Sequence, residues 1–580
     1  MSVADWIVLT VALAGIVVYG LYKSRTDKNL EGYFLSNNSM PWYMVLLSIM
    51  GTQASAITFL SAPGQAFTDG MRFVQYYFGL PLAMIILCIT FVPAFSKLRV
   101  FTAYEFLEQR FDKKTRYFTS ALFLLSRGLS TGISIYAPSI ILSSLLGWNI
   151  YWTNIAMGGM LIIYTVSGGA KAVAYTQQLQ MLVIFLGMFV AAYMLVHYLP
   201  ENVGVVDALK VGGMAGKMNV ITSGITSDGH FNWKDRYNII SGLIGGFFLA
   251  LSYFGTDQSQ VGRYLTAKND TESKLGLLLN GLVKVPMQFF VLLIGVLLFA
   301  FYQFNPQPLF FNNAVNSRVY KTAYADSLKK TEATYSIVMQ RQQQQVVQWL
   351  QADKAGNAEQ AAQYKGQIQQ SLAQGNTLKQ QYKQYLQKAD SSIDVNDTNY
   401  IFLKFVVDYL PKGLVGLLIA VIFLAAWGSI AAALNSLASC TMIDFVCRKS
   451  RKEINECGAE DRLKQYQSSK WITMVWGLFS IAVAGFANRM GSLIEAVNIL
   501  GSLFYGVILG IFLVAFYCKS MKSTAVFTGA LLAQVVVILL FVLDRYNIIG
   551  IGFLWFNVIG ALLVVMLGWL IHALLPAKTV

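Results

Sequence analysis

Charged residues and histidine are scarce in this chain of 580 residues, of which only 13% are charged and three are histidine. A soluble domain ordinarily carries about a quarter charged residues. The hydrophobic residues make up 56% of the chain and gather in repeated apolar stretches. Each stretch is about 20 residues long, which is the length that crosses the hydrocarbon core of a bilayer. The shortage of charge therefore argues against a soluble protein and predicts an all-α polytopic membrane protein.

Cysteine and histidine, the residues most often used for disulfides, metal sites and acid–base catalysis, are also few. The five cysteines have no paired spacing, so neither disulfides nor a zinc site is indicated. His197, His230 and His572 lie at span ends or in a loop, and no HExxH motif occurs. We therefore expect no enzyme. The first apolar stretch, 3–22, lacks the basic region and cleavage site of a signal peptide, so we expect a retained helix.

Hydropathy and length predict about 13 membrane spans. They are expected near 3–22, 41–67, 72–96, 117–146, 149–168, 174–199, 239–263, 275–304, 401–445, 470–487, 491–517, 523–543 and 551–574. The long stretch 401–445 is expected to begin with a surface helix.

The loops between these spans predict the orientation of the chain. Basic residues near span ends remain on the cytoplasmic side of a membrane. Lys and Arg concentrate in alternate short loops, at 23–28, 97–116, 263–274, 448–464 and 519–522. We therefore expect an external N-terminus and a cytoplasmic C-terminus in a bacterial inner membrane. The net charge of +15 then reflects membrane topology, and no nucleic-acid partner is expected.

Residues 305–400 differ from the rest of the chain, because they are polar and rich in Gln, Lys and Ala. Long runs without Pro or Gly favour helix. The orientation places this insertion outside the membrane. We expect a helical hairpin that stands off the membrane and takes no part in transport chemistry.

Small and hydroxyl residues interrupt two spans, at 48–64 and 242–258. A broken helix exposes backbone carbonyls and helix ends at mid-membrane, where transporters place their sites. Each broken span begins a set of five, 41–199 and 239–517. Five is an odd number, so the two sets have opposite orientations, as in the inverted repeat of a LeuT-like transporter. The alternative is that the small residues only allow close helix packing.

The expected organisation follows from these sets. It comprises an N-terminal extra helix and loop (1–40), a first five-helix repeat (41–199), an external loop (200–238), a second repeat (239–304 and 401–517), an external Gln-rich helical insertion (305–400) and two C-terminal helices (518–580).

Several motifs resemble one known family. They are Gly51–Gly64, Tyr136–Leu142, Tyr164–Thr176, Gln258–Tyr264 and Ala425–Ser436. Together they resemble the sodium/solute symporter family, and the second and third are most similar to its iodide, multivitamin and monocarboxylate branch. The resemblance covers nearly everything except 305–400. It implies a sodium-coupled secondary symporter that imports a small polar organic solute by alternating access.

The resemblance also implies a sodium site between the first and eighth core helices. Sodium is a hard cation, which prefers oxygen ligands. The family positions correspond to Gly51, Ala54, Ala425, Gly428 and Ser429. Two departures concern this site: Gly428 lacks the hydroxyl that the family has there, and Gln177 stands where an acid is common. These departures leave open a passive or otherwise coupled, sodium-independent transporter. Ser429 is alternatively a hydroxyl bonded back to its own helix.

Substrate candidates come from ionisable residues within spans, which are costly there and are functional candidates by default. Arg127, Lys284 and Glu495 are such residues. The resemblance adds Gln53, Ser55, Thr58 and Tyr253, and it relates Lys284 to a sugar-binding lysine. Alternatively, Arg127 or Lys284 pairs with Glu495 or Asp257. The surplus of cations favours a sugar, sialic acid or another organic anion as substrate.

The partners expected from these residues are sodium as the co-transported ion, a small-molecule substrate and the lipid bilayer. We expect a monomer. A transporter-like sensor remains a third interpretation, but such chains usually append a cytoplasmic signalling domain, and this sequence stops at Val580 shortly after its final span.

Overall fold

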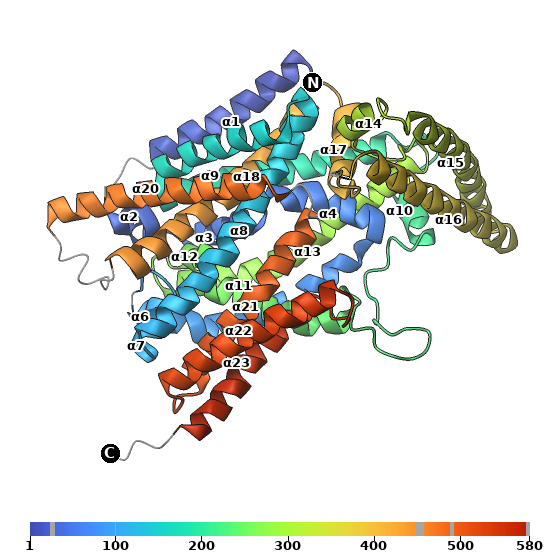
Figure 1. The fold of residues 1–580 in the computed structure, drawn as a ribbon. Coiled ribbons are helices and arrows are strands. Elements are labelled where there is room, and N and C mark those ends of the chain that lie inside the picture. Colours follow the sequence, from blue (N-terminus) through green and yellow to red (C-terminus); the bar gives the residue numbers. More distant parts are fainter. Residues whose placement is uncertain (24–28, 99, 392, 448–457, 488–491, 576–580) are drawn as a thin grey trace.

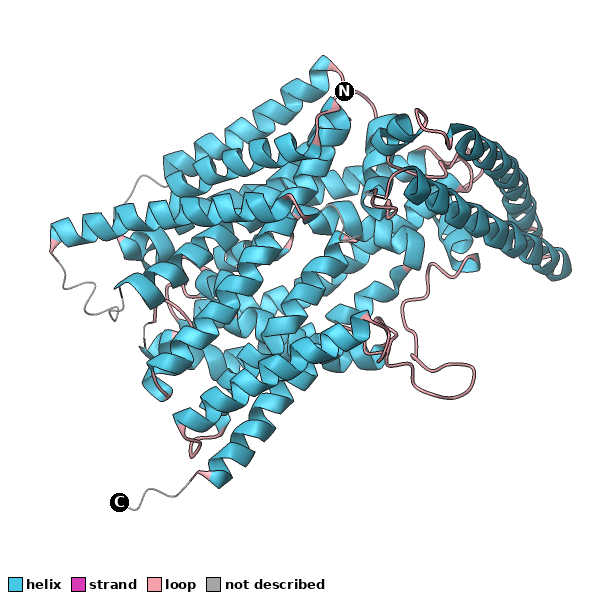
Figure 2. Ribbon diagram, in the orientation of Figure 1, coloured by secondary structure: helices cyan, strands magenta, loops and turns pink. Residues whose placement is uncertain are grey.

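The computed structural model describes residues 1–23, 29–98, 100–391, 393–447, 458–487 and 492–575. Within these ranges every extended regular element is a helix (Figure 2), and the only strand-like pairings are two isolated bridges. A bilayer imposes this choice, because a spanning helix pairs its own backbone groups where no water is available. The prediction of an all-α membrane protein is therefore confirmed.

The helices follow one another along the chain as Figure 1 labels them. The first part contains α1 (Val3–Lys23), α2 (Leu30–Leu35), η1 (Ser36–Asn38), α3 (Trp42–Gln53), α4 (Ala56–Asp69), η2 (Met71–Tyr77), α5 (Leu80–Ile86), η3 (Leu87–Phe91), α6 (Val92–Leu98), α7 (Glu105–Arg110), α8 (Lys113–Leu146), α9 (Ile150–His197) and α10 (Val205–Met214). The middle part contains η4 (Ser241–Gly245), α11 (Gly246–Thr256), α12 (Gln258–Tyr264), α13 (Asp270–Tyr302), α14 (Asn313–Val319), α15 (Ala325–Lys354) and α16 (Ala358–Ala389). The last part contains α17 (Thr398–Tyr409), α18 (Leu414–Cys440), η5 (Thr441–Cys447), α20 (Ala459–Ala484), α21 (Leu493–Tyr517), α22 (Ser523–Arg545) and α23 (Leu554–Leu574).

The number of spans differs from the expected 13. In the described residues nine helices are long and apolar enough to cross a membrane, or ten if the bent pair α3 and α4 counts as one span. The expected spans 149–168 and 174–199 both lie in α9, whose two helical segments meet at a kink where Gly169 takes φ 60°. A count of 13 is not confirmed, because apolar segments such as Ile150–Val166 and Ser241–Thr256 are shorter than a full span.

Two helices are broken at the places that the sequence indicates. α3 and α4 meet at 60° around Ala54 and Ser55. The second break separates α11 from α12 at Asp257, which has extended backbone angles. The side chain of Asp257 caps α12 by accepting a hydrogen bond from the Ser259 amide at 2.7 Å. A carboxylate is well suited to this position, because it satisfies a free N–H and interacts favourably with the helix dipole.

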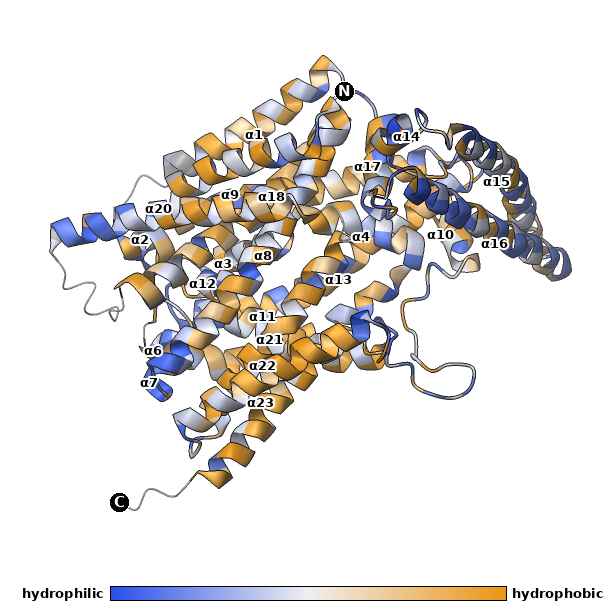
Figure 3. Ribbon diagram, viewed as in Figure 1, coloured by the Kyte–Doolittle hydropathy of each residue, from blue (hydrophilic) through white to orange (hydrophobic). Residues whose placement is uncertain are grey.

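α18 forms the centre of the bundle. Every residue from Leu418 to Cys440 is buried. A helix that is apolar on all sides is expected in such a position. Apolar residues also dominate the surrounding spans, whereas polar residues collect at the two ends of the bundle and on α15 and α16 (Figure 3). At one end, Asp5 accepts hydrogen bonds from the Gly413 and Gly416 amides, and so links α1 to the start of α18.

The hairpin of α15 and α16 and the N-terminus lie at one end of the bundle, whereas α7 and the C-terminus lie at the other (Figure 1). This relative placement agrees with the arrangement expected from the basic loops. Which end faces the cytoplasm stays a prediction.

We expect the hairpin to be external. In a cysteine-free variant, a single cysteine at the exposed Gln344 should react with a membrane-impermeant maleimide in intact spheroplasts. The matched control is a cysteine at the exposed Lys464, near the opposite end of the bundle, which should react only after lysis. The reverse pattern would invert the topology.

Candidate functional site

The break between α3 and α4 leaves backbone carbonyls without their helical donors. The Ser55 amide donates to the Gln53 carbonyl at 3.0 Å, and the Thr58 amide donates to the Ser55 carbonyl at 2.9 Å. In an unbroken helix these two amides would bond the carbonyls of Gly51 and Ala54. Both carbonyls are expected sodium ligands. The break therefore frees the oxygens that a cation needs.

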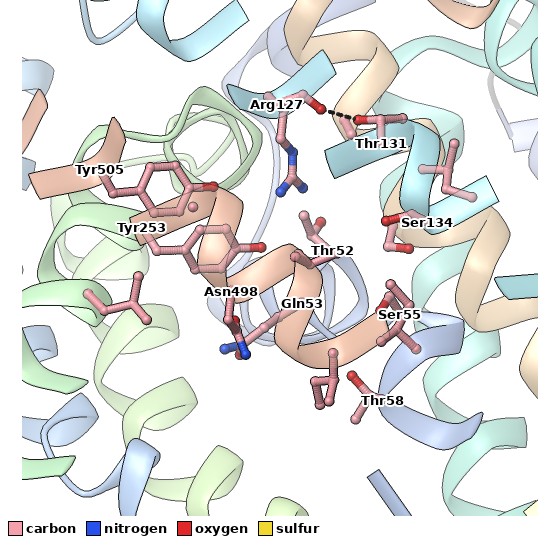
Figure 4. A pocket seen from close by; sticks show the side chains of 18 of the residues that line it. Thr52, Gln53, Ser55, Thr58, Arg127, Thr131, Ser134, Tyr253, Asn498 and Tyr505 are labelled. Atoms are coloured by element: carbon pink, nitrogen blue, oxygen red, sulfur yellow. Dashed lines mark hydrogen bonds between the residues drawn. The ribbon is translucent and has the colours of Figure 1, made fainter. Parts of the chain in front are cut away.

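A cavity of about 820 Å³, including the space at its open mouth, lies against this break. It is bounded by η2, α3, α4, α8, α11, α18 and α21 and contains hydroxyl, amide and aromatic groups (Figure 4). The polar and aromatic lining residues are Thr52, Gln53, Ser55, Thr58, Tyr76, Tyr77, Arg127, Thr131, Ser134, Tyr253, Ser429, Asn498 and Tyr505. Of the seven residues expected at the substrate, Gln53, Ser55, Thr58, Arg127 and Tyr253 line this cavity. We call it the central cavity.

Arg127 is the one Lys, Arg, Asp, Glu or His side chain in the described lining of the central cavity. Its guanidinium extends from α8 toward Tyr253 and the α3–α4 break (Figure 4). The Arg127 Nη1 lies 3.7 Å from Asp257 Oδ2, and the guanidinium carbon lies 5.8 Å from the centre of the Tyr253 ring. The alternative pairing of Arg127 with Asp257 is thus present, but as a long ion pair.

Asp257 has closer partners than Arg127. Its Oδ2 accepts a hydrogen bond from the Tyr505 hydroxyl at 2.7 Å, and its Oδ1 accepts bonds from the backbone and hydroxyl of Ser259. Arg127 Nε is buried and has no hydrogen-bond acceptor among the described residues. Gln53 Oε1 likewise lacks a donor there. Buried polar groups are normally paired, so both groups are available for a bound solute.

The residues expected at the sodium site come from α3 and α18, which the side chain of Gln177 connects. Gln177 Nε2 donates to the Gly428 carbonyl at 3.0 Å and to Thr52 Oγ1 at 3.1 Å. Its Oε1 accepts from the Ser48 hydroxyl at 2.7 Å. The Gln177 amide therefore bridges the two helices at the position where the family commonly has an acid.

Ser429 and Gly428 occupy adjacent but different surroundings. The Ser429 hydroxyl lines the central cavity and donates back to the carbonyls of Ala425 and Ala426 at 3.1 Å each. The alternative of a back-bonded serine is thus present in this structure, although the same hydroxyl oxygen retains lone pairs for a cation. A Cβ at Gly428 would overlap Oε1 of Gln180, so a larger residue there must displace that amide.

Two expected substrate residues lie outside the described lining of the central cavity. Lys284 on α13 is completely buried, and its Nζ has no hydrogen-bond acceptor among the described residues. It lies 5.9 Å from the ring centre of Tyr77, which does line the cavity. Glu495 is bonded to Arg236 at 2.6 Å and to the Tyr237 hydroxyl at 3.3 Å. Their roles at the substrate stay predictions.

Several lining residues were not expected from the sequence. Thr131 and Ser134 follow Arg127 by four and seven residues, so helical periodicity along α8 was the available signal. Asn498 and Tyr505 share a face of α21 in the same way. Tyr76 and Tyr77 come from the short 3₁₀ helix η2, and no periodic pattern pointed to them.

A broken-helix bundle with a polar cavity at the break is typical of secondary transporters. The model of the sodium:solute symporter family matches residues 33–326 and 386–535, so the chain belongs to this family. The match omits 327–385, which comprises most of α15 and α16. The chain is therefore a sodium-coupled solute symporter, a multi-pass inner-membrane protein and not an enzyme, as the sequence predicts, and Na⁺ is its co-transported ion.

Individual relatives cover nearly the whole chain. The sodium/sialic acid symporter NanT of Aliivibrio fischeri is 25% identical to this chain, in an alignment that covers 98% of this chain and 92% of NanT. The sodium/sialic acid symporter SiaT of Proteus mirabilis is also 25% identical and covers 99% and 96%. The rabbit (Oryctolagus cuniculus) sodium-dependent multivitamin transporter is 25% identical over 91% of this chain and 69% of its own.

A solved structure shows the same fold. It is the substrate-bound outward-open state of a Na⁺-coupled sialic acid symporter, with a TM-score of 0.73, 22% identity and complete coverage of both chains. The LeuT-like fold is thereby confirmed, and the family resemblance is confirmed by the match to the family model.

We expect Ser429→Ala to raise the half-saturating sodium concentration by about three- to tenfold, since an ion held by neutral oxygens loses one of them. Apparent substrate affinity at fixed sodium should fall with it, because the two affinities are reciprocally coupled. Uptake by proteoliposomes at varied sodium measures both quantities. Unchanged sodium dependence would place the ion away from Ser429.

At the neighbouring position, Gly428→Ser adds the hydroxyl that the family has there. Gly428→Ala is the matched control, because both variants displace the Gln180 amide but only serine supplies a ligand. We expect the serine variant to need about two- to fivefold less sodium for half-saturation than the alanine variant. Equal values for the two variants would show that the position does not contact the ion.

Proposed function

We propose that this symporter imports sialic acid, or another hydroxylated organic acid with one carboxylate, through the central cavity. The same cavity residues bind the solute in our proposal: Gln53, Ser55, Thr58, Arg127 and Tyr253. The sodium ion binds beside them at the carbonyls of Gly51, Ala54 and Ala425 and the hydroxyl of Ser429. Gly428 contributes its backbone only.

The observation that supports an acidic substrate is the unpaired Nε of Arg127 in a cavity with no described lysine, aspartate or glutamate in its lining. A guanidinium binds a carboxylate through two parallel hydrogen bonds. The hydroxyl groups of Ser55, Thr58 and Thr131 provide partners for a polyhydroxyl solute. Relatives named as sialic acid symporters support the same class of substrate.

Sodium binding and solute binding are coupled through the α3–α4 break, which contributes to both sites. A sodium ion moving inward gains about 2.3 kcal/mol per 100 mV of membrane potential, in addition to its concentration gradient. If both ligands favour the same outward-facing state, this energy drives solute import. Release then occurs on the opposite side after the two repeats rock relative to each other.

The finer assignments follow the same proposal. Lys284 acts on the solute indirectly, through its contact with the Tyr77 ring. Glu495 acts by binding Arg236 near the central cavity. In this proposal the chain functions as a monomer. Its N-terminus is external and its C-terminus is cytoplasmic.

We expect Arg127→Ala to raise the apparent KM for N-acetylneuraminate by about 10- to 100-fold, because a charge-assisted contact worth roughly 1.5–3 kcal/mol is lost. Half-saturating sodium at saturating solute should change less than threefold. The measurement is uptake of labelled N-acetylneuraminate by proteoliposomes in sodium and in choline buffer.

Arg462→Ala is the matched control, since this exposed arginine lies on α20 outside the central cavity. Unlabelled sugars, amino acids and carboxylates, added as competitors, identify the substrate class. If N-acetylneuraminate is not taken up but a neutral solute is, the proposal of an acidic substrate is wrong. If the KM of Arg127→Ala stays within about twofold, Arg127 is structural.

A further inference from the structure

The polar hairpin of α15 and α16 encloses a second cavity against the end of the bundle. This hairpin cavity has a volume of about 1240 Å³ including its open mouth. Phe67 and Thr68 of α4 contribute to it, whereas Ser55 and Thr58 of the same helix line the central cavity. The two cavities have no described lining residue in common.

The charge of the hairpin cavity is strongly unbalanced. Lys217, Lys379 and Lys383 line it, and Asp397 is the only acidic residue in its described lining. Lys383 lies 3.6 Å from Asp397, which also accepts a hydrogen bond from the Phe311 amide. Lys217 donates to the Thr68 carbonyl. One carboxylate thus faces three ammonium groups.

Lys379 has no carboxylate within ion-pair distance among the described residues. Its Nζ lies 5.7 Å from the centre of the Tyr335 ring. Burial lowers the pKa of Lys379 to about 8, and the charges of Lys383 and Lys217 act in the same direction against the opposing effect of Asp397. An anion placed among these lysines would stabilise the ammonium form and raise this pKa again.

The remaining surface of the hairpin cavity is suited to hydroxyl groups and to an apolar ring face. Gln342 is completely buried, and its Oε1 has no donor among the described residues. Asn376 and Gln380 add further amides, and Phe299 and Tyr335 add aromatic faces. Amide oxygens accept hydrogen bonds from hydroxyl groups, which chloride does not offer.

Ion pairs hold the hairpin at a fixed position over the bundle. Lys354 at the end of α15 lies 2.8 Å from Asp207 of α10, and Lys210 lies 2.7 Å from Asp353. Gln342 also donates to Gln303, which follows α13. These contacts, which do not involve the cavity's lysines, help to hold the hairpin cavity in addition to the Lys383–Asp397 pair.

We propose that the hairpin cavity is a second binding site for hydroxylated organic acids, separate from the central cavity and formed in part by an insertion that the family model does not match. The carboxylate binds between Lys217, Lys379 and Lys383, and the hydroxyls bind the surrounding amides. This site does not depend on which solute the central cavity transports.

Trace acetylation by acetic anhydride tests the proposal in the purified full-length protein. Lys379 lines the open hairpin cavity, so acetic anhydride can reach it at pH 8, and a bound acid should slow its acetylation. We expect N-acetylneuraminate or glucuronate at about 10 mM to lower the acetylation rate of Lys379 by at least about threefold. Glucose should have no effect, and neither should sodium chloride at equal ionic strength. Peptide mass spectrometry measures each lysine separately.

Lys388 is the internal control, because it is exposed on the same helix outside the cavity. Lys383→Gln should reduce the protection of Lys379 by at least about threefold, while transport at saturating solute shows that the variant is folded. Arg127→Ala should leave the protection unchanged. The proposal is overturned if neither acid slows the acetylation of Lys379, or if the acids slow the acetylation of Lys388 to the same extent. It is also overturned if inorganic phosphate protects Lys379 as well as the acids do, or if Arg127→Ala abolishes the protection.

Discussion

The unpaired backbone between α3 and α4 is the constraint on which the rest of the bundle depends. No water pairs with free carbonyls in the hydrocarbon core, so a broken helix is stable only where protein surrounds it. Gly276 and Gly295 allow α13 to pack closely beside α3 and α4, since a Cβ at Gly295 would overlap the Pro63 carbonyl. α18 and the Gln177 side chain cover the break from other sides. The same enclosure leaves the freed oxygens of Gly51 and Ala54 for a cation.

Gln177 changes how that enclosure is held together. A carboxylate at this position would attract a cation, whereas an amide both donates and accepts hydrogen bonds. The donor side of Gln177 satisfies the Gly428 carbonyl and Thr52, and the acceptor side takes the Ser48 proton. At the sodium site that we propose, a neutral bridge between α3 and α18 therefore stands where a carboxylate would attract the ion. The two departures from the family pattern, Gly428 and Gln177, therefore meet in one hydrogen bond, from the Gln177 amide to the Gly428 carbonyl.

Arg127 lines the central cavity, whereas Asp257 lies outside its described lining, and the two charges have different partners. Tyr505 and Ser259 bind Asp257 more closely than Arg127 does, so the acid is satisfied without the arginine. Arg127 keeps one free donor, and Gln53 keeps one free acceptor. The hairpin cavity at one end of the bundle likewise contains an acid that is paired and a cation that is not, among the described residues: Asp397 lies close to Lys383 but not to Lys379. Each place therefore offers unpaired groups to the acidic, hydroxylated solute that we propose.

The sequence by itself determined the class of fold, because apolar runs of span length and two Gly/Ser-rich interruptions act locally and are visible in one chain. It also indicated Arg127, since ionisable residues within membrane spans are rare enough to be conspicuous. Gln53, Ser55, Thr58 and Tyr253 were indicated by the family resemblance instead. Only the tertiary structure decided which of them meet. Lys284 and Glu495 have the same intramembrane character as Arg127, yet they lie outside the central cavity lining because their helices turn them toward Tyr77 and Arg236. The hairpin cavity was equally invisible, because its lysines are separated by up to 166 positions and become neighbours only when α16 folds back over the bundle.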